Sequence, residues 1–296
     1  MKKRGFRRVL FVLLALFVAG ILFILVSVYL SANAIVVTVY GCESPKIEEP
    51  IDLLLLTDMH AHSFQEGNAR LLRCVAKEAP DVILIAGDAL NWYSESHDYV
   101  TNLVERLSRI APVYFTVGNH DAKYMTQSQD YGLLDEIEQA GAAALNAGYV
   151  DVVVKGQKLR IGGLYDFVFN RNGMDEEAYR QTEGYRFLAG FEDTDDFKLL
   201  LAHQPNFLLD DDPEARWDID LAVCGHEHGG QVRIPFYGGF YSTHLGWFSP
   251  YLDGAHLING IPTVISRGLG TYTKGGYRIV PPRFCNIPEL VRIELR

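Results

Sequence analysis

The sequence contains few cysteines, and their positions indicate neither a disulfide framework nor a metal site. Four cysteines among 296 residues are too few for a disulfide-rich scaffold, and their spacing matches no zinc-binding pattern. Cys42 and Cys285 lie near opposite ends of the chain that follows the N-terminal region, so they stay open as a candidate pair.

Basic residues are also scarce outside the first eight positions. The chain has 27 Lys and Arg against 37 Asp and Glu, a net charge of −10. Five of the basic residues lie within residues 1–8, and residues 1–30 contain no acidic residue. Residues 31–296 therefore carry 22 basic and 37 acidic side chains, a net charge of −15. Such a charge argues against nucleic acid as a partner, but it permits an anionic substrate where metal ions supply positive charge.

A long apolar run follows the basic segment. Residues 9–30 are interrupted only by Gly20, Ser27 and Tyr29, and as a helix they would span roughly 33 Å, enough for a hydrocarbon core of about 30 Å. Because the cations precede the run, the positive-inside rule places residues 1–8 in the cytoplasm and everything after residue 30 outside. We expect a single-pass cell-membrane protein with a transmembrane signal-anchor helix over 9–30 and an extracytoplasmic catalytic domain.

Two alternatives stay open for this region. Ala32-Asn33-Ala34 resembles the cleavage site of a removable signal peptide, although the apolar part of such peptides is usually about 7–15 residues long. A buried core helix fits poorly, because the run has no amphipathic period and follows a group of cations.

Residues 31–50 are expected to connect this helix to one large domain over 51–296. In that domain apolar runs alternate with helical patterns, which is typical of parallel strands joined by crossover helices. Strands are expected at Leu53–Thr57, Val82–Ala86, Val113–Val117, Leu199–Ala202, Leu221–Cys224, Thr263–Ser266 and Glu289–Leu295. Helices are expected at Ala69–Glu78, Glu95–Arg109 and Tyr131–Ala140, and a hairpin at Tyr149–Ile161.

Three further segments are expected to be loops. Glu192–Asp196 and Asp210–Asp212 are acidic and should be solvated. Phe236–Tyr251 is rich in glycine and aromatic residues, and it has three open interpretations. It could wall a substrate pocket, touch a membrane surface, or pack only on itself.

Polar side chains follow five of the predicted strands, at the point where each strand ends. In open α/β sheets ligands bind beyond the carboxyl ends of the strands, so we expect these residues to converge. Burying carboxylates and imidazoles together is costly unless cations satisfy them. Such ligands suit Mn, Fe or Zn, and a carboxylate can bridge two ions about 3.5–4 Å apart for hydrolysis at phosphorus. The residues are Asp58, His60, Asp88, Asn119, His120, Asp121, His203, His226 and His228.

With these motifs the chain resembles the calcineurin-like metallophosphoesterase superfamily, and more closely its membrane-anchored, YkuE- and YaeI-like bacterial branch. The resemblance covers residues 51–296 and is strongest at Gly118–Asp121 and at GHEHGGQVRIP, residues 225–235. Ser266–Gly270 and Pro288-Glu289 also fit it. It implies an α/β fold, a four-layer sandwich of two mixed β-sheets flanked by helices.

The resemblance also implies two divalent ions and a role for each motif residue. One ion would be held by Asp58, His60, Asp88 and His228, and the other by Asp88, Asn119, His203 and His226, with Asp88 as the bridge. His120 would face the leaving group, and Asp121 is expected to be catalytic beside it. A bridging water, acidified by the two ions, would attack phosphorus in line.

Three residues depart from the pattern or extend it. Asn91 stands where many relatives have an aspartate that orients the catalytic histidine; an amide oxygen can still accept from an imidazole N–H. His62 replaces a glycine and is either a substrate contact or a surface histidine. Arg267 lies in a glycine-flanked loop, where it is a candidate phosphate contact.

The function that follows is a two-metal phosphoesterase acting outside the cytoplasmic membrane. Phosphodiesters or pyrophosphates of lipid- or sugar-linked envelope molecules are the expected substrates, as for UDP-diacylglucosamine-type hydrolases. A protein or small-molecule phosphomonoesterase is the alternative enzyme, although the Arg-bearing segment of the protein phosphatases is absent. A membrane-anchored binding module that has lost catalysis is the non-enzyme alternative.

Overall fold

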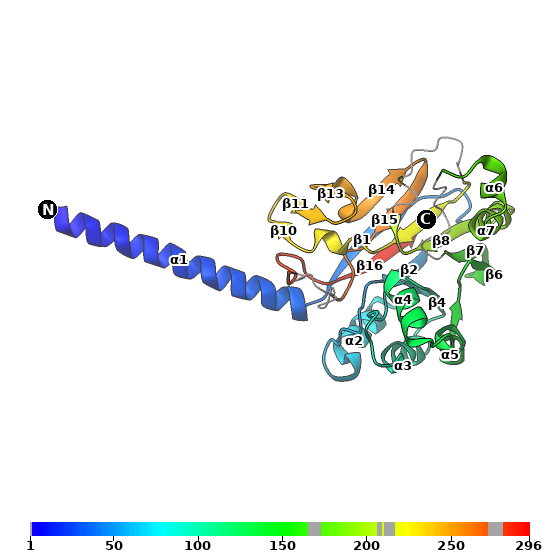
Figure 1. Ribbon diagram of the computed structural model, residues 1–296, viewed down its shortest axis with the longest axis horizontal. Helices are drawn as coiled ribbons and strands as arrows, with labels where there is room; N and C mark the ends of the chain where they lie inside the picture. The colour runs from blue at the N-terminus through cyan, green and yellow to red at the C-terminus, as the bar shows by residue number, and fades with distance from the viewer. Residues whose placement is uncertain (1, 165–172, 206–208, 210–216, 272–280) are drawn as a thin grey trace.

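A single long helix, α1 (Lys2–Asn33), projects from a layered α/β domain (Figure 1). The computed structural model describes residues 2–164, 173–205, 209, 217–271 and 281–296. Within α1, residues 4–33 are long and apolar enough to cross a membrane, and no part of their most apolar stretch is buried inside the protein. The segment Asp210–Asp212, expected to be a loop, lies outside the described residues.

The first of the two large sheets has six strands, and all but one of its pairings are parallel. β16 runs antiparallel to β2, so the sheet is mixed as expected. In spatial order the strands are β1 (Val36–Cys42), β16 (Glu289–Leu295), β2 (Ile51–Leu56), β3 (Val82–Ala86), β4 (Val113–Thr116) and β5 (Ala142–Ala144). Residues 36–42, assigned to the connecting segment from sequence, thus form an edge strand that pairs with β16.

The second sheet also has six strands and is also mixed. Its outer pairs, β14 with β15 and β6 with β7, are antiparallel, whereas the inner pairings are parallel. In spatial order the strands are β14 (Gly254–Ile258), β15 (Ile261–Ile265), β9 (Leu221–Cys224), β8 (Phe197–Ala202), β7 (Gln157–Leu164) and β6 (Gly148–Val154).

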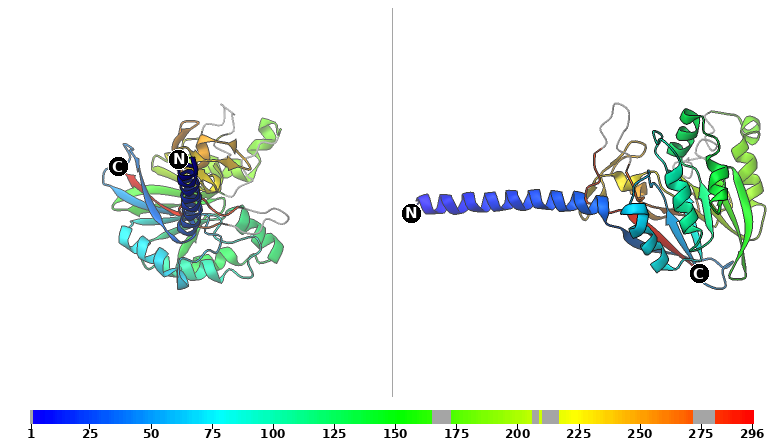
Figure 2. Two further views of the ribbon diagram at one scale, coloured as in Figure 1. Left: turned by 90° about the vertical axis from the view of Figure 1, so that its left-hand side faces the viewer. Right: turned by 90° about the horizontal axis from the view of Figure 1, so that it is seen from below.

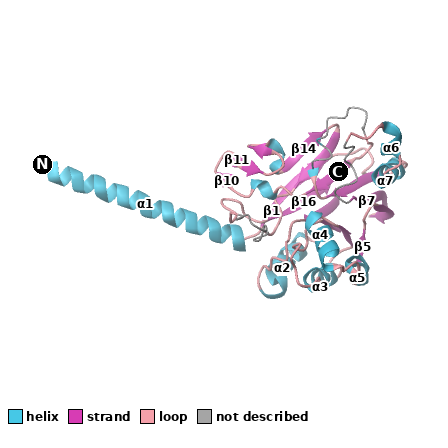
Figure 3. Cartoon of the chain, viewed as in Figure 1, coloured by secondary structure: helices cyan, strands magenta, loops and turns pink. Residues whose placement is uncertain are grey.

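The two sheets pack face to face, with helices on their outer faces (Figures 2 and 3). Leu53 and Leu55 of β2 meet Leu199 and Leu201 of β8 in the central core, while Leu54 faces the outer helices. Alternate side chains of one strand are therefore buried on both faces, which explains the continuous apolar runs in the sequence. The four-layer sandwich is confirmed.

Six α-helices accompany the sheets in the described part of the chain, besides α1. The first sheet is covered by α2, α3 and α5, and the second by α7. The helices are α2 (Ala69–Glu78), α3 (Asp98–Leu107), α4 (Asn119–Ser128), α5 (Leu133–Gln139), α6 (Glu176–Arg180) and α7 (Glu183–Glu192). The helix α4 was not expected, because its sequence, NHDAKYMTQS, is mostly polar and has a weak apolar period.

The C-terminal part of α1 is docked on the domain. The backbone N–H groups of Cys285 and Asn286 donate to the hydroxyls of Ser27 and Ser31, at 2.7 and 3.1 Å. Both serines are buried. The Cys285 thiol also accepts a hydrogen bond from Ser27, and all four cysteines are free, so Cys42 and Cys285 do not form a disulfide here. The loop 283–286 therefore holds the end of the apolar helix.

Candidate metal centre

The five polar strand ends converge at one edge of the sandwich, as the sequence predicts. Asp58 and His60 follow β2, Asp88 follows β3, and Asn119 follows β4 in the first sheet. The second sheet supplies residues after β8 and β9, namely His203, His226 and His228. Because both sheets contribute, the side chains meet between the two layers.

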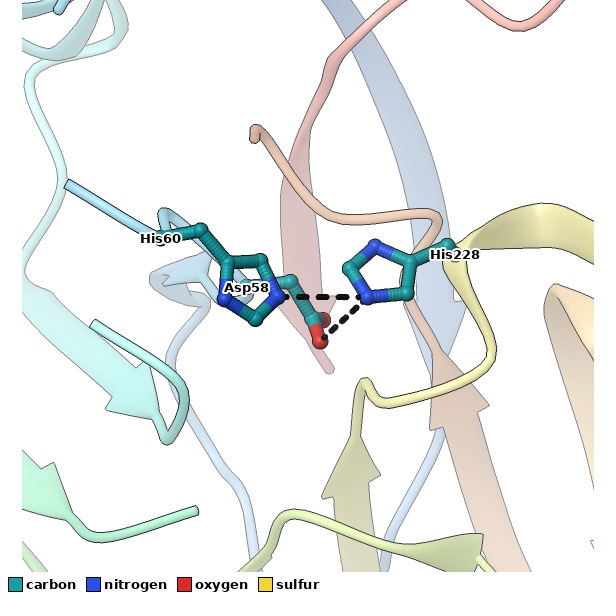
Figure 4. Close-up of side chains that lie close together, drawn as sticks. All are labelled: Asp58, His60 and His228. Atoms are coloured by element: carbon teal, nitrogen blue, oxygen red, sulfur yellow. Dashed lines mark hydrogen bonds and ion pairs between the residues drawn. The ribbon is translucent and has the colours of Figure 1, made fainter. Parts of the chain in front are cut away.

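Asp58, His60 and His228 form the first of two neighbouring ligand clusters, which a third group, His60, Asp88 and His120, links (Figure 4). The Nε2 atoms of His60 and His228 lie 3.2 Å apart, and the Nε2 of His228 lies 3.7 Å from Oδ1 of Asp58. The three side chains point their ligand atoms toward a common point. This geometry suits a single cation held by two imidazoles and a carboxylate.

Asp88, His203 and His226 form the second cluster. The Nε2 of His203 lies 3.2 Å from Oδ2 of Asp88 and 3.3 Å from Nδ1 of His226. Oδ2 of Asp88 also lies 3.8 Å from Nε2 of His60 in the first cluster. Asp88 is therefore located between the two clusters, where a bridging ligand would be.

Asn119 and His120 begin helix α4 at the edge of the second cluster. The Oδ1 of Asn119 accepts a hydrogen bond of 3.4 Å from the side-chain amide of Gln204. The ring of His120 packs edge-on against that of His60, with centroids 4.7 Å apart, and a nitrogen of His120 lies close to the ligand atoms of His60 and Asp88. His120 is thus beside the centre.

The backbone of the ligand loops is strained. Residues with a positive φ are uncommon outside glycine, and they gather at functional sites. Five of the expected ligands have φ between 48° and 72°: Asp58, His60, Asp88, His226 and His228. Gly118 has no room for a side chain, because a Cβ there would lie 2.2 Å from Oδ1 of Asp88. The glycines beside the ligands therefore let the loops approach one another closely.

Burial and neighbouring charges shift the pKa values of the ligands, and burial raises the pKa of Asp58 to about 6. Desolvation lowers the pKa of His60 to about 3 and holds the pKa values of His226 and His228 well below their ordinary value. Although burial opposes it, the neighbouring His203 ring holds the pKa of Asp88 well below its usual range. Neutral imidazoles and an ionised bridging carboxylate are the forms that bind metal ions. The donor set thus fits divalent cations.

Two residues expected to be catalytic, Asp121 and Asn91, form hydrogen bonds to the backbone of the ligand loops. Asp121 is completely buried, and its carboxylate accepts hydrogen bonds from the backbone N–H groups of Leu90 and Gly118, at 2.8 and 3.0 Å. It therefore ties the loop after β3 to the loop after β4. The side-chain amide of Asn91 donates to the carbonyl of His60 at 2.7 Å. Its buried Oδ1 has no hydrogen-bond partner among the described residues, so it makes no hydrogen bond to the His120 ring.

The two expected substrate contacts are engaged elsewhere. His62 is partly exposed, and its Nε2 donates to the carbonyl of Ala32 at the end of α1, at 3.0 Å. Arg267 forms an ion pair of 2.7 Å with the buried carboxylate of Glu289. In this structure His62 thus contacts the apolar helix, and Arg267 fixes the loop after β15 to β16.

Four further residues at the centre were given no role from sequence, and of these only Glu227 belongs to a quoted motif, between His226 and His228. Arg283 is buried, its Nη2 lies 3.4 Å from Nδ1 of His228, and burial lowers its pKa to about 10, so it remains charged at neutral pH. Asn286 donates from its side chain to the carbonyl of His228 at 2.7 Å. His244 lies 3.1 Å from the outer nitrogen of His226, and Glu227 completes a cluster with these two histidines.

A layered sandwich of two mixed sheets, with clustered aspartates and histidines at the shared strand edge, defines a metal-dependent hydrolase of phosphate esters. Residues 51–230 match the model of the calcineurin-like phosphoesterase family. The chain belongs to this family, whose members bind a dimetal centre, and it is a metallophosphoesterase.

Individual relatives support the same assignment at low identity. The chain is 23% identical to the metallophosphoesterase YkuE of Bacillus subtilis over 276 residues, 90% of this chain and 88% of YkuE. It is 24% identical to the phosphodiesterase YaeI of Escherichia coli, over 64% of each chain. A transmembrane protein with a metallophosphoesterase domain from Danio rerio is 27% identical, over 85% of this chain and 54% of its own.

Proposed function

We propose that this chain is a membrane-anchored phosphodiesterase that uses two divalent ions and acts outside the cytoplasmic membrane. The observation that carries the proposal is the location of Asp88 between two ligand clusters. A shared carboxylate of this kind is characteristic of two-metal sites, in which the ions lie about 3.5–4 Å apart.

The residues of the centre have complementary tasks. The six aspartate and histidine ligands would hold the ions, and Asn119 would supply an amide oxygen at the second one. When bound, Mn, Fe or Zn supplies Lewis acidity at the phosphoryl oxygens and lowers the pKa of water. Arg283 keeps a buried positive charge close to His228, which favours an anionic substrate. His120 donates a proton to the leaving alkoxide.

Phosphodiesters or pyrophosphates of lipid- or sugar-linked envelope molecules are the proposed substrates. The name of the relative YaeI supports diester chemistry. The position of the centre supports a lipid-linked substrate, because the loop 283–286 contacts both His228 and the end of α1. The cluster of cations before residue 9 supports the topology, with residues 1–8 in the cytoplasm and the phosphoesterase domain on the other side.

A substrate profile tests the proposal. The full chain, purified in detergent and supplied with Mn, should hydrolyse bis-p-nitrophenyl phosphate and a nucleotide-sugar pyrophosphate faster than p-nitrophenyl phosphate. Asp88→Ala should abolish all three activities. Preference for the monoester would contradict the assignment as a diesterase, and turnover without any metal after chelation would contradict the two-metal centre.

A further inference from the structure

The segment 234–248, here called the aromatic segment, has an unusual surface. It contains six aromatic residues, and the sequence has no Asp, Glu, Lys or Arg from 234 to 252. Six of its large apolar side chains are exposed: Ile234, Phe236, Tyr237, Tyr241, Trp247 and Phe248. Contiguous exposed apolar patches of this kind mark interaction sites on otherwise soluble domains.

The aromatic segment is ordered rather than loose. It forms two short hairpins, β10 (Arg233–Ile234) with β11 (Gly238–Gly239) and β12 (Tyr241–Ser242) with β13 (Gly246–Trp247). Inside it, the ring of Phe240 packs edge-on against the rings of Trp247 and Phe248, with centroids 4.9 and 5.4 Å apart. An ion pair of 2.7 Å between Arg233 and Asp253 joins its two ends. The exposed rings are therefore presented by a braced platform.

Phe236 combines an exposed aromatic ring with an unfavourable backbone conformation. It is fully exposed at the turn between β10 and β11, and its φ is 68°. Bulky residues rarely adopt this left-handed conformation, and where they do, the strain is often tied to function. Within the residues that the structure describes, the Phe236 ring is therefore presented to solvent and is not packed on the domain.

The aromatic segment lies at the end of the domain from which α1 leaves, as both views agree (Figures 1 and 2). The contacts of α1 with the domain show where this end of the domain lies along the apolar run. Phe23 packs edge-on against Phe284 of the domain, with ring centroids 5.8 Å apart. Phe23 precedes Leu30, the end of the apolar run, by seven residues, or about 10 Å of helix. The domain therefore packs beside the last part of the apolar run and does not begin only after Leu30.

We propose that the aromatic segment is a second membrane-contact surface, which inserts into the outer face of the bilayer beside α1. This inference rests on the proposed anchoring of the chain by residues 9–30. Trp and Tyr are enriched at membrane–water interfaces, where one end of the ring is apolar and the other is hydrated. The absence of charge also matters, because the acidic remainder of the domain would be repelled by anionic lipid.

The same segment reaches the metal centre. His244, in the turn between β12 and β13, lies 3.1 Å from His226, while Trp247 is exposed on the same hairpin. A membrane-seated segment would thus hold the centre at the bilayer surface. The substrate class that fits is a phosphodiester whose apolar chains stay in the bilayer while its headgroup enters the centre.

Lipid-depth quenching tests the membrane contact directly. The full chain is reconstituted in vesicles of phosphatidylcholine and phosphatidylglycerol, with or without phosphatidylcholine brominated near the glycerol backbone. The signal of Trp247 is the difference between wild type and Trp247→Phe, which leaves Trp92 and Trp217 in both. Bromine should quench most of this signal, and aqueous acrylamide little. The reverse pattern would overturn the proposal.

A comparison of two diesters with the same leaving group tests the consequence for substrate. The variant Phe236→Ser/Tyr237→Ser/Trp247→Ser should lose about tenfold or more on phosphatidyl-p-nitrophenol in these vesicles, as expected when apolar side chains no longer leave water. Its kcat on soluble bis-p-nitrophenyl phosphate should be unchanged. Tyr131→Ser/Val153→Ser, which removes exposed apolar side chains elsewhere, is the matched control.

The outcomes separate this inference from the proposed function. Equal losses on both diesters would mean that the aromatic segment belongs to the substrate pocket. No loss on either diester would show that the aromatic segment does not contribute to catalysis at the bilayer. Failure of wild type on both diesters would instead contradict the phosphodiesterase assignment, while the quenching of Trp247 would still decide the membrane contact.

Discussion

The carboxylate of Asp88 lies 3.2 Å from the Nε2 of His203. Its Oδ2 atom also lies 3.8 Å from the Nε2 of His60, so one oxygen faces ligands from both sheets of the sandwich. A carboxylate so located couples the two clusters, because the loss of its charge removes a ligand from each of them.

Asp88→Ala should therefore remove both ions, whereas Asn119→Ala should mainly weaken the ion of the second cluster. Metal content of the purified full chain, measured by mass spectrometry after equilibration with Mn, distinguishes the two variants. Because metal catalysis supplies several kcal/mol, diester hydrolysis by Asp88→Ala should fall by about a thousandfold or more. Asp135→Ala, on the exposed face of α5, is the control. Full metal content in Asp88→Ala would show that this carboxylate is not shared.

The accuracy of the fold prediction depended on burial. The bounds of β3 and β9 were predicted correctly, because each strand is an apolar run that is buried throughout. β1 was missed, since an edge strand is only partly buried and its pattern alternates weakly. α4 was missed because its first residues, Asn119 and His120, serve the metal centre rather than the core.

The metal ligands could be predicted because each lies just after a strand. The ends of these strands meet at one edge of the sandwich, so residues that follow them come close together. The supporting residues could not be predicted. Arg283 and Asn286 reach His228 only through the packing of the loop 283–286, and His244 reaches His226 only through a short hairpin. For His62, the local sequence could not decide between a substrate contact and a surface histidine, because its hydrogen-bond partner, Ala32, lies 30 residues away.

Asn286→Ala should weaken the first ligand cluster without touching a metal ligand. The Asn286 side chain donates to the carbonyls of His228 and Gln231, and it is completely buried. Loss of such outer contacts typically lowers metal affinity by about 10–100-fold. Titration of the chelator-treated full chain with Mn should reveal weaker binding of one ion only. Asn102→Ala, on the surface of α3, should bind both ions normally; an identical titration curve for Asn286→Ala would contradict the expectation.

The topology predicts a clear result in cells. Five cations precede the apolar run, so the domain should be extracytoplasmic. Protease added to intact spheroplasts should digest the domain, while a cytoplasmic marker protein survives. Removal of the charge bias, by replacing Lys2, Lys3, Arg4, Arg7 and Arg8 with Gln, should reduce digestion. Complete protection of the wild-type domain until the membrane is opened would place it in the cytoplasm.

A pH-dependent contribution to stability is expected from His97, which lies away from the metal centre. Its ring is 2.6 Å from Asp130 and 2.7 Å from Glu136. Although burial opposes it, hydrogen bonds to these carboxylates raise the pKa of His97 above its ordinary value of 6.5. The contribution is therefore complete below pH 6.5 and is lost as the pH rises through the higher, folded-state pKa.

Urea unfolding of the full chain in detergent, followed from pH 6 to about pH 9, measures this effect. The free energy of unfolding should decline over that window in wild type and decline less in His97→Gln. Tyr149→Phe, on the opposite side of the sandwich, should keep the wild-type slope. Parallel curves for wild type and His97→Gln would mean that the imidazole does not titrate differently on folding.

The last prediction concerns proton donation by His120, whose ring packs against His60 without being one of the seven expected ligands. A leaving alkoxide needs a proton, and general acid assistance is worth about 10²–10⁴ in rate. His120→Ala should therefore lose far more activity on an alkyl phosphodiester than on bis-p-nitrophenyl phosphate, whose leaving group needs no proton. Metal content should stay unchanged, because the role does not require coordination.

The pH dependence of the same reaction provides an independent check. Burial lowers the pKa of His120 below 6.5, so its protonated fraction declines as the pH rises toward neutrality. Turnover of the alkyl diester by wild type should show a falling limb that begins below pH 6.5 and is absent in His120→Ala. Equal losses on both esters would mean that His120 stabilises the phosphoryl group instead, and loss of metal from His120→Ala would make it a ligand.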